Sequence, residues 1–487
     1  MEAKRMHPMK MVFSYILTLR NSLFPLFFLF IIHMNDTSIF YRGARWLMIA
    51  YLIWRIFSVY IAWRKTTYSL SEDTVHIQRG LFKKETSKVP ITNIQNIQRK
   101  IPFYYKPFGV VFLALETNAS GDHATVKLEA VGKSEAAQIE RRISEPAAPQ
   151  DLAERTDTPA NKENMSRTVH YWPTKKDLRK ASFLSFSFLA LIPVLLTIFK
   201  QADEVFHVDE KAEGIWESIS ASYWWMALLI VVLIIAAVAF GMIKTHLTYG
   251  NYEIASDEAY IYIRKGVLNE RSFSIRKSRV QAVRILQPPW KRIFQLLEVK
   301  LVIAGSDEDA DDDKEINSLY PYLPSDKAMA IIQELLPQFT MPESSHRLPP
   351  KALKVRMLRL PWFWLVVTAA IFLFFKSFWY ISPILFILQY AYRYFNYRNT
   401  RYSFDASMIL VEQKGLWREQ FMTSRKNLVE MEITQSLYQK IFGLVTVHTV
   451  NRAAPIHEET LHDVTQTVAK ALMDWYEKRG EDIRLKA

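Results

Sequence analysis

The sequence predicts an α+β membrane protein in which three pairs of apolar helices alternate with three copies of one antiparallel β-sheet module. Three observations support this prediction. Half of the 487 residues are hydrophobic, yet the mean hydropathy is only −0.03, so long apolar blocks must alternate with polar blocks. The polar blocks contain alternating strand patterns that end in a helical pattern. The same short motif also marks three places in the chain.

The repeated motif has three anchors. An alternating polar and apolar run ends at a glycine in each copy, namely Gly80, Gly266 and Gly415. Ten residues later come Pro90, Arg276 and Arg425. An aromatic-x-basic-x-Phe pattern then ends at Phe108, Phe294 and Phe442. The near-constant spacing of the three anchors argues against chance similarity and predicts one module repeated three times.

Each copy has the pattern of strands followed by one helix. Alternation at 74–78 and 260–264 predicts β-hairpins with one side facing water. Further strands are expected over 110–115, 125–129, 299–304 and 444–449. Apolar residues at helical spacing close the copies at 133–143, 326–335 and 462–477. A curved antiparallel sheet closed by one C-terminal helix accounts for this order.

Six apolar stretches are candidates for transmembrane helices, and they form three hairpins. They cover 12–34, 45–63, 182–199, 222–243, 361–377 and 378–396. Arg20 and Arg55 interrupt the first pair, and a central arginine costs about 2.5 to 3.5 kcal/mol on insertion scales, so we expect snorkelling or pairing there. A tight turn near Lys376 is expected to join the last pair. The first stretch has no small-x-small cleavage pattern and should remain as an anchor.

The charge distribution predicts the orientation. Lys and Arg gather on one side of the hairpins, which the positive-inside rule assigns to the cytoplasm. The loop of the second hairpin is instead acidic over 203–217. We therefore expect a multi-pass protein of the cell membrane with both termini and all three modules in the cytoplasm. The net charge of +13 also suits contact with an anionic surface.

The expected domain boundaries follow from these patterns. They are 1–65 for hairpin 1, 66–145 for module 1, 146–180 for a linker, 181–244 for hairpin 2, 245–337 for module 2, 338–359 for a second linker, 360–397 for hairpin 3 and 398–487 for module 3.

The motifs resemble a known family, the bacterial pleckstrin-homology-like (PH-like) membrane proteins of the YdbT type, which have three such domains. The residues that carry this resemblance are Gly80-Leu81, Gly415-Leu416, the segment 94–97, Phe108-Gly109 and Phe442-Gly443. The second copy departs from this pattern, because Val267 follows Gly266 and Gln295 follows Phe294. The resemblance covers nearly the whole chain. It implies PH-like modules, a smaller membrane partner of the same domain kind and a role in cell-envelope defence.

Recurring basic and aromatic residues are the candidate contacts for lipid or a partner. A cation precedes each turn glycine, at Arg79, Lys265 and Lys414, and another stands two positions before each motif phenylalanine, at Lys106, Arg292 and Lys440. Each could add about 1 kcal/mol near an anionic membrane. Alternatively, their stems cover apolar surface while their charged ends stay in water. The motif aromatics Tyr104, Trp290 and Tyr438 either enter the membrane interface or pack within the module.

Catalysis finds no support in the sequence. It contains no phosphate-binding loop, nucleophile elbow or His-Glu-x-x-His motif, and the absence of cysteine excludes thiolate chemistry. The acidic run at 307–315 is interpreted as a solvated insertion rather than a calcium site. His457 and His462, which flank Glu458 and Glu459, are interpreted as a surface cluster. We therefore expect a protein that is no enzyme, with no catalytic residue, metal, cofactor or nucleic-acid partner.

The function predicted from the sequence is an integral membrane scaffold. Its three modules are expected to contact anionic membrane lipids, one another or a partner membrane protein, and their apolar faces also allow a homo-oligomer. The alternative is a transporter or permease subunit that uses the six helices, because Arg20, Arg55 and Lys376 lie in or near the bilayer. Acidic partners and paired broken helices, which transporters often have, are missing from these stretches.

Overall fold

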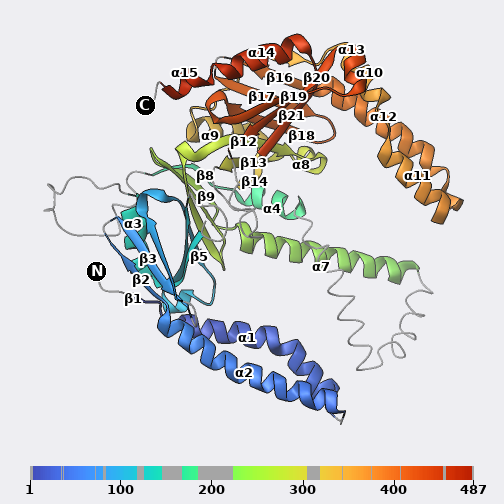
Figure 1. Ribbon diagram of the computed structural model, residues 1–487. Helices are drawn as coiled ribbons and strands as arrows, with labels where there is room; N and C mark the ends of the chain where they lie inside the picture. Colours follow the sequence, from blue (N-terminus) through green and yellow to red (C-terminus); the bar gives the residue numbers. More distant parts are fainter. Residues whose placement is uncertain are drawn as a thin grey trace. The chain divides into compact units, whose positions relative to one another are not determined.

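The computed structural model describes residues 4–484 apart from 35, 37, 72, 81–83, 118–124, 145–166, 185–222, 304–317, 343, 375, 406 and 453–456. The chain divides into two compact units. The first unit contains Met1–Ser166 and Leu268–Ile275, and the second contains Arg167–Val267 and Arg276–Ala487 (Figure 1). Each unit is described on its own below.

Unit 1 begins with a short strand and a helical hairpin. The elements are β1 (Lys4–Arg5), α1 (Met9–Phe27), a π-helical turn η1 (Phe28–Ile32) and α2 (Ile39–Lys65). Arg55, one of the two arginines that interrupt the apolar stretches, donates a hydrogen bond to Thr18 Oγ1 on the facing helix at 3.3 Å. Pairing therefore offsets part of the cost that the sequence predicts for this charge.

Module 1 follows the hairpin and consists of two groups of three strands. The first group is β2 (Thr67–Leu70), β3 (Thr74–Arg79) and β4 (Glu85–Pro90), and the second is β5 (Ile94–Ile101), β6 (Val110–Thr117) and β7 (Thr125–Gly132). The turn η2 (Ile91–Asn93) joins the groups, η3 (Lys106–Phe108) lies between β5 and β6, and α3 (Lys133–Ser144) ends the module.

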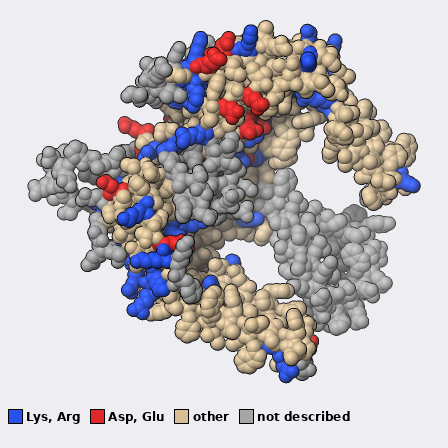
Figure 2. Space-filling view, viewed as in Figure 1, with Lys and Arg blue, Asp and Glu red and all other residues tan. Residues whose placement is uncertain are grey.

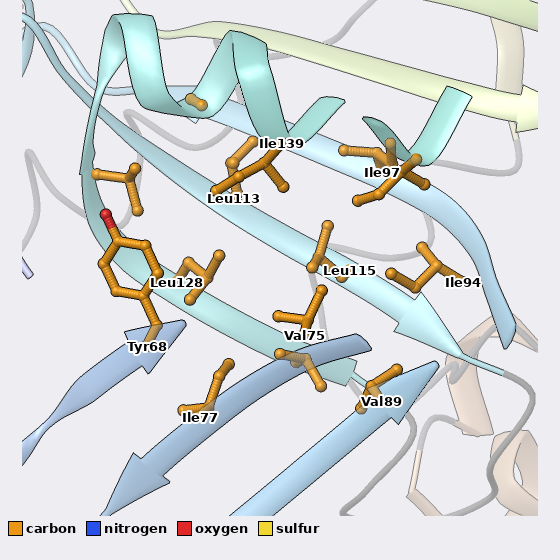
Figure 3. Close-up of a cluster of buried hydrophobic side chains, with 14 of the residues drawn as sticks. Tyr68, Val75, Ile77, Val89, Ile94, Ile97, Leu113, Leu115, Leu128 and Ile139 are labelled. Atoms are coloured by element: carbon orange, nitrogen blue, oxygen red, sulfur yellow. The ribbon is translucent and has the colours of Figure 1, made fainter. Parts of the chain in front are cut away.

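The core of module 1 lies between the two groups of strands and the closing helix. Val75 and Ile77 of β3 pack with Leu113 and Leu128 of the second group and with Ile139 of α3 (Figure 3). Leu113 and Leu128 are completely buried. Truncation of such a leucine to alanine costs about 2 to 5 kcal/mol, so this core is the main source of the module's stability.

Module 2, in unit 2 except for its third strand, repeats this order. Its elements are β8 (Thr168–Tyr171), α4 (Lys175–Leu184), α7 (Tyr223–Tyr249), β9 (Glu253–Ser256), β10 (Tyr260–Lys265), β11 (Glu270–Arg276), η6 (Lys277–Arg279), β12 (Val280–Gln287), α8 (Pro289–Ile293), β13 (Leu296–Ile303), β14 (Ser318–Pro324) and α9 (Ser325–Leu335).

Module 3 and its hairpin complete unit 2. The elements are β15 (His346–Arg347), α10 (Pro350–Leu358), α11 (Trp362–Phe374), η8 (Lys376–Phe378), α12 (Ile381–Asn399), β16 (Thr400–Phe404), β17 (Met408–Lys414), β18 (Arg418–Ser424), η9 (Arg425–Asn427), β19 (Leu428–Thr434), α13 (Leu437–Phe442), β20 (Leu444–Asn451), β21 (His457–Thr465), α14 (Gln466–Glu477) and α15 (Arg479–Arg484).

A strand that precedes each hairpin in the sequence joins the module that follows the hairpin. β1 pairs with β2, β8 with β9 and β15 with β16, always antiparallel. The predicted linkers 146–180 and 338–359 are therefore not plain connections. Each contributes an edge strand to the next module, and the second also contains α10. The pattern went unnoticed in the sequence because two to four residues are too few for a periodic signal.

Successive modules share sheets. In unit 1, β11 of the second repeat pairs with β5 of the first, with Ile275 opposite Asn96. In unit 2, β18 of the third repeat pairs with β12 of the second, with Thr423 opposite Ala282. The expectation of one curved sheet per module is therefore wrong, because each module splits at its 3-10 turn. The second halves of modules 1 and 2 continue into the next repeat, and that of module 3 forms a sheet of its own. The α+β class itself is confirmed.

Three helices in the described part of the chain are long and apolar enough to cross a membrane. They are Met9–Ile32, Ile39–Lys65 and Pro350–Phe374. In Figure 2 the surface of the α1–α2 hairpin is almost free of charged side chains between its ends. The predicted stretches 222–243 and 378–396 are helical in α7 and α12, and 182–199 lies mostly outside the described residues. The predicted number of six transmembrane helices is thus not confirmed.

The structure also bears on the expected closing helix of module 3 and on the expected turn of the third hairpin. The closing helix of module 3 begins at Gln466 rather than at 462, because His457–Thr465 form β21. The turn expected near Lys376 is η8, which connects α11 and α12. The acidic run 307–315 and the segment 146–164 lie outside the described residues.

Candidate functional site

The short helix between the fourth and fifth strands is the most informative surface of each module. η3, α8 and α13 occupy this position, and each carries one of the predicted cations: Lys106, Arg292 or Lys440. All three residues are exposed. Lys106 forms an ion pair with Glu270 at 2.8 Å, so its charge is partly engaged. The aromatic-x-basic-x-Phe motif therefore marks one equivalent site in all three modules.

Large apolar side chains are exposed beside these cations. Phe103 and Phe108 flank Lys106 and are at least half exposed. Ile293 next to Arg292 is 78% exposed, and Leu437 and Ile441 around Lys440 are 81% and 75% exposed. Exposed apolar residues around a cation are characteristic of a surface that meets a protein partner or the lipid interface, where acyl chains take the apolar groups and headgroups take the charge.

In module 1 the short helix lies at the base of the α1–α2 hairpin. The ring of Phe13, in the second turn of α1, stacks on Tyr105 at 4.3 Å between ring centres and contacts Tyr104 at 4.9 Å. Phe108 meets the same ring edge-on at 6.2 Å. The exposed apolar surface of module 1 is therefore next to a helix that is apolar enough to cross the membrane.

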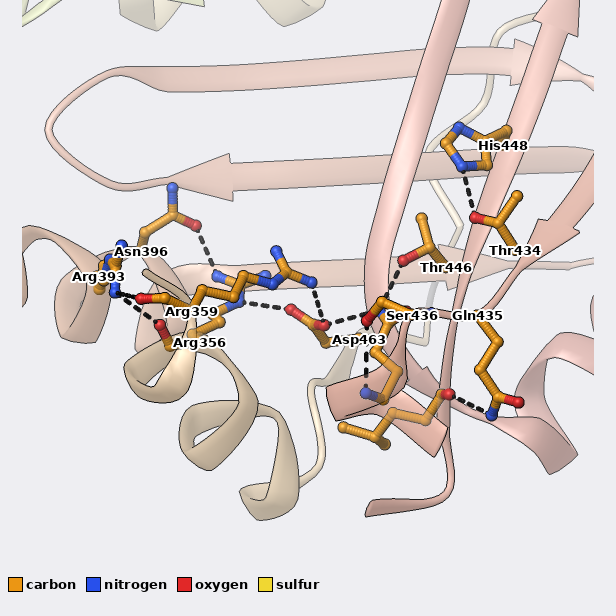
Figure 4. A network of polar contacts seen from close by, with 12 residues as sticks. Arg356, Arg359, Arg393, Asn396, Thr434, Gln435, Ser436, Thr446, His448 and Asp463 are labelled. Carbon is orange, nitrogen blue, oxygen red and sulfur yellow. Dashed lines mark hydrogen bonds and ion pairs between the residues drawn. The ribbon is translucent and has the colours of Figure 1, made fainter. Parts of the chain in front are cut away.

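In module 3 the corresponding helix α13 is tied to the base of the third hairpin. A capping box formed by Ser436 and Gln439 starts α13. The Gln439 side chain donates to Asp463 Oδ1 at 2.9 Å and to Thr446 Oγ1 at 2.7 Å. Asp463, at the end of β21, is completely buried. It accepts hydrogen bonds from Arg356 Nε at 3.0 Å and Arg359 at 2.8 Å (Figure 4).

A third arginine completes this network. Arg393 of α12 donates to the backbone carbonyls of Arg356, Arg359 and Leu360, where α10 ends. Arg356 also donates to Asn396 Oδ1 at 2.9 Å. Arginine therefore caps the C-terminal carbonyls of α10 and joins the two arms of the hairpin, a favourable arrangement for a cation at a helix C-terminus.

The arginines line a pocket of about 180 Å³ between the hairpin base and module 3. Its lining residues are Arg356, Arg359, Tyr392, Arg393, Asn396, Thr400, Gln413, Thr460, Leu461 and His462. None of these carries a negative charge, and Asp463 behind the wall neutralises one of three arginines. The pocket is consequently cationic and large enough for several water molecules or a phosphate group.

His462 adds a neutral hydrogen-bonding group to the pocket wall. Burial lowers the pKa of this imidazole, and the charge of Arg359 lowers it further. The ring is therefore uncharged near neutral pH, because its pKa lies below the usual histidine range. The positive charge of the pocket comes from arginine alone.

The cations before the turn glycines do not form a common site. Arg79 donates to the backbone carbonyl of Lys127, Lys265 is buried, and Lys414 forms an ion pair with Glu412 at 2.8 Å. The motif aromatics also differ among the copies. Tyr104 packs on Phe13, Trp290 meets Trp417 edge-on at 5.0 Å, and Tyr438 is 39% exposed.

The arginine pocket is not apparent from the sequence. There, Arg356, Arg359 and Arg393 only add to the one-sided distribution of Lys and Arg, and no motif marks Asp463. About a hundred residues separate Arg356 from Asp463, so only the tertiary fold brings them together. The interpretation of 457–462 as a surface cluster is wrong for Glu459, which is buried, whereas Glu458 is exposed as expected. Burial, followed by the nearby charge of Glu419, raises the pKa of Glu459 to about 7. Among the described residues, no group of His, Asp and Glu has the arrangement of a metal site.

Comparison with known proteins agrees with this architecture. The family model of the bacterial PH domain matches three times, at residues 23–147, 193–338 and 355–480. The chain therefore belongs to the bacterial PH domain family, as the resemblance predicted. It is 26% identical over 491 residues to the UPF0699 transmembrane protein YdbT of Bacillus subtilis (strain 168), with 99% of both chains covered. No solved structure matches the chain.

Proposed function

We propose that this protein is a membrane-anchored scaffold whose PH-like modules hold anionic lipid at the membrane surface. The observation that carries the proposal is the short helix of each module, which exposes a cation among large apolar side chains. In modules 1 and 3 this helix adjoins a helical hairpin. The orientation follows the positive-inside rule, so the lipids would belong to the cytoplasmic leaflet, which is rich in anionic headgroups.

The arginine pocket gives the proposal its most specific site. Arginine binds phosphate with directional hydrogen bonds, and the pocket lies where α10 and α12 meet module 3. A phosphodiester headgroup is the ligand class that suits a cationic pocket at the end of an apolar hairpin. The role in envelope defence stays a prediction from the resemblance, because none of these contacts bears on it.

The depth of the short helices tests the proposal. The chain lacks cysteine, so single cysteines at Phe103, Ile293 and Leu437 can carry an environment-sensitive fluorophore. In nanodiscs with phosphatidylglycerol, we expect these labels to be quenched by bromine on the lipid acyl chains. Matched labels at Ser87 and Asp474, which are exposed on other elements, should not be quenched. Equal and weak quenching at all five positions would contradict membrane contact.

Charge removal tests the anionic preference separately. The double variant Arg292→Gln/Lys440→Gln removes two exposed charges, worth about 1 kcal/mol each near an anionic surface. We expect the preference for phosphatidylglycerol over phosphatidylcholine to fall by up to roughly 30-fold, as measured with spin-labelled lipids. Lys106→Gln should have a smaller effect because Glu270 already neutralises that charge. The preference should also weaken in 1 M salt, where the Debye length is about 3 Å.

A further inference from the structure

The two junctions between successive modules follow one rule. The third strand of a later module pairs antiparallel with the fourth strand of the module before it, as β11 does with β5 and β18 with β12. The register is the same at both junctions. The residue just before the last of β11, Ile275, faces Asn96, and the corresponding residue of β18, Thr423, faces Ala282. Asn96 and Ala282 each follow the same bulge of the fourth strand.

Two strands are left without a partner by this rule. β4 is the third strand of module 1, the first module in this sequence, and β19 is the fourth strand of module 3, the last module in this sequence. In the described part of the chain each of them ends its sheet. The strands that precede the hairpins (β1, β8 and β15) and the sixth strands of the modules (β7, β14 and β21) end sheets in all three copies, so among the described strands only β4 and β19 depart from the pattern of the other copies. We call their outer sides the open edges.

Exposure distinguishes the open edges from their paired counterparts. Five of the six residues of β4 are exposed, whereas no residue of β11 or β18 is. Four of the seven residues of β19 are exposed, whereas none of β12 is. Val429 and Ile433 of β19 are 47% and 37% exposed. Strand edges with exposed apolar residues are templates for pairing with another chain.

The ends of the open edges are compatible with strand addition. Pro90 cannot donate a backbone hydrogen bond, but its counterpart Arg276 lies outside the paired register of the first junction. At the other edge, Tyr476 donates to the carbonyl of Val429 at 2.6 Å, and Arg425 is bound to Asp482 of α15 at 2.7 Å. These contacts lie at the N-terminal end of β19. Pairing by the junction rule would start at Glu430 and leave them in place.

We propose that β19 of one copy pairs with β4 of a second copy, so that the chains join head to tail. The two open edges are the two halves of the internal junction, which makes a second copy of this chain the fitting occupant. The junction register places Glu430 opposite Val89 and Ile433 opposite Thr86. Two copies anchored in one membrane also have the same orientation relative to that membrane, as neighbouring modules of one chain do. Such a heterologous contact gives a ring if it closes and a linear array if it does not.

The charges of the open edges favour this pairing over self-pairing of β19. β19 carries Glu430 and Glu432 and no cation. β4 carries Lys88 and Glu85, with Lys84 just before it. Two copies of β19 side by side would bring four glutamates together, which is destabilising. Next to β4 in the junction register, Glu430 instead faces Val89 and Glu432 faces Ser87, so no like charge lies directly opposite either glutamate.

Cysteine crosslinking in this cysteine-free chain tests the proposal. Two differently tagged full-length chains, one with Thr86→Cys and one with Ile433→Cys, are expressed together and oxidised in membranes. We expect a crosslinked heterodimer, since opposite residues in paired strands have Cα atoms about 4.5 to 5.5 Å apart. The double variant Arg99→Cys/Ser272→Cys is the matched control, because these residues occupy the same positions at the internal junction.

Three outcomes decide the question. Efficient formation of the Thr86–Ile433 heterodimer, with several-fold less from Ser87→Cys paired with Ile433→Cys, supports the predicted register. No heterodimer, while the Arg99–Ser272 control crosslinks within one chain, overturns the proposal and shows that the fold is intact. A crosslink from Thr86→Cys or Ile433→Cys to a different protein, such as a smaller PH-like partner, also overturns it. None of these readouts depends on lipid binding, so they stand apart from the proposed function.

Discussion

At the scale of single residues, the repeat predicts positions better than it predicts backbone geometry. The sequence identified the departure of copy two, where Gln295 stands in place of a glycine. The structure gives Gln295 a φ of 56°, close to the 61° of Gly109 and the 68° of Gly443. The shared fold therefore imposes the left-handed conformation on a residue that pays about 1 to 2 kcal/mol for it. The alignment of the three repeats reveals the turn, whereas the backbone strain becomes visible only in the folded structure.

Replacement of Gln295 should relieve this strain. We expect Gln295→Gly to raise the free energy of unfolding by about 1 kcal/mol, because glycine adopts positive φ at no steric cost but loses more chain entropy on folding. Thermal unfolding of the full chain in detergent measures the change. Gln295→Ala is the matched control, since alanine keeps the strain and the side chain of Gln295 is exposed. A gain in Gln295→Ala equal to that of Gln295→Gly would rule out backbone strain as the cause.

The candidate site residues also divide into those that the repeat reveals and those that only the fold reveals. Lys106, Arg292 and Lys440 could be found from the sequence because they recur at one place in a repeated motif. Arg356, Arg359 and Asp463 occur in a single copy and approach one another only in the fold. A repeat signal cannot reveal a site that only one repeat contains.

At the scale of elements, Asp463 connects three of them. Its carboxylate binds Arg356 of α10 and Gln439 of α13, and its backbone belongs to β21. The sequence predicted a helix from 462 because the apolar spacing continues backwards into the strand. The strand prevails because β21 pairs with β20 along its length. Tertiary pairing thus decides a boundary that local periodicity leaves ambiguous.

Loss of the charge at Asp463 should loosen the third hairpin from module 3. Asp463→Asn preserves the size of the side chain and tolerates the φ of 64°. It leaves Arg356 buried without its counter-charge, which costs about 3 to 5 kcal/mol. We expect a clear fall in the temperature of thermal unfolding.

Two further variants interpret that result. Asp482→Asn is the control, because the Asp482 side chain is 26% exposed whereas that of Asp463 is completely buried, so water screens the Asp482 ion pair and its loss should matter less. The double variant Arg356→Met/Asp463→Asn should recover part of the lost stability, since it no longer buries an unpaired charge. If Asp463→Asn unfolds at the same temperature as Asp482→Asn, the network does not fasten the hairpin.

At the scale of the whole molecule, strand pairing constrains the membrane topology. The sequence predicted three modules on one side from the distribution of Lys and Arg. The structure supplies an independent reason. Because β18 pairs with β12 and β11 pairs with β5, strands from successive repeats cannot lie on opposite sides of a bilayer. We therefore expect the chain between the paired strands to cross the membrane an even number of times. The third hairpin fits this requirement, since α12 packs along α11 after η8.

Cysteine accessibility in intact cells tests this topology. We expect an impermeant thiol reagent to label Met34→Cys and Ser377→Cys, at the far ends of the first and third hairpins, because both are exposed and lie opposite the modules along their helices. Asp73→Cys, Glu258→Cys and Asp474→Cys, one exposed position in each module, should react only after lysis. Labelling of Asp474→Cys before lysis, with Asp73→Cys protected, would mean an odd number of crossings and would be incompatible with a shared sheet. Labelling of all three module positions, with Met34→Cys and Ser377→Cys silent, would instead keep the shared sheets and reverse the orientation expected from the positive-inside rule.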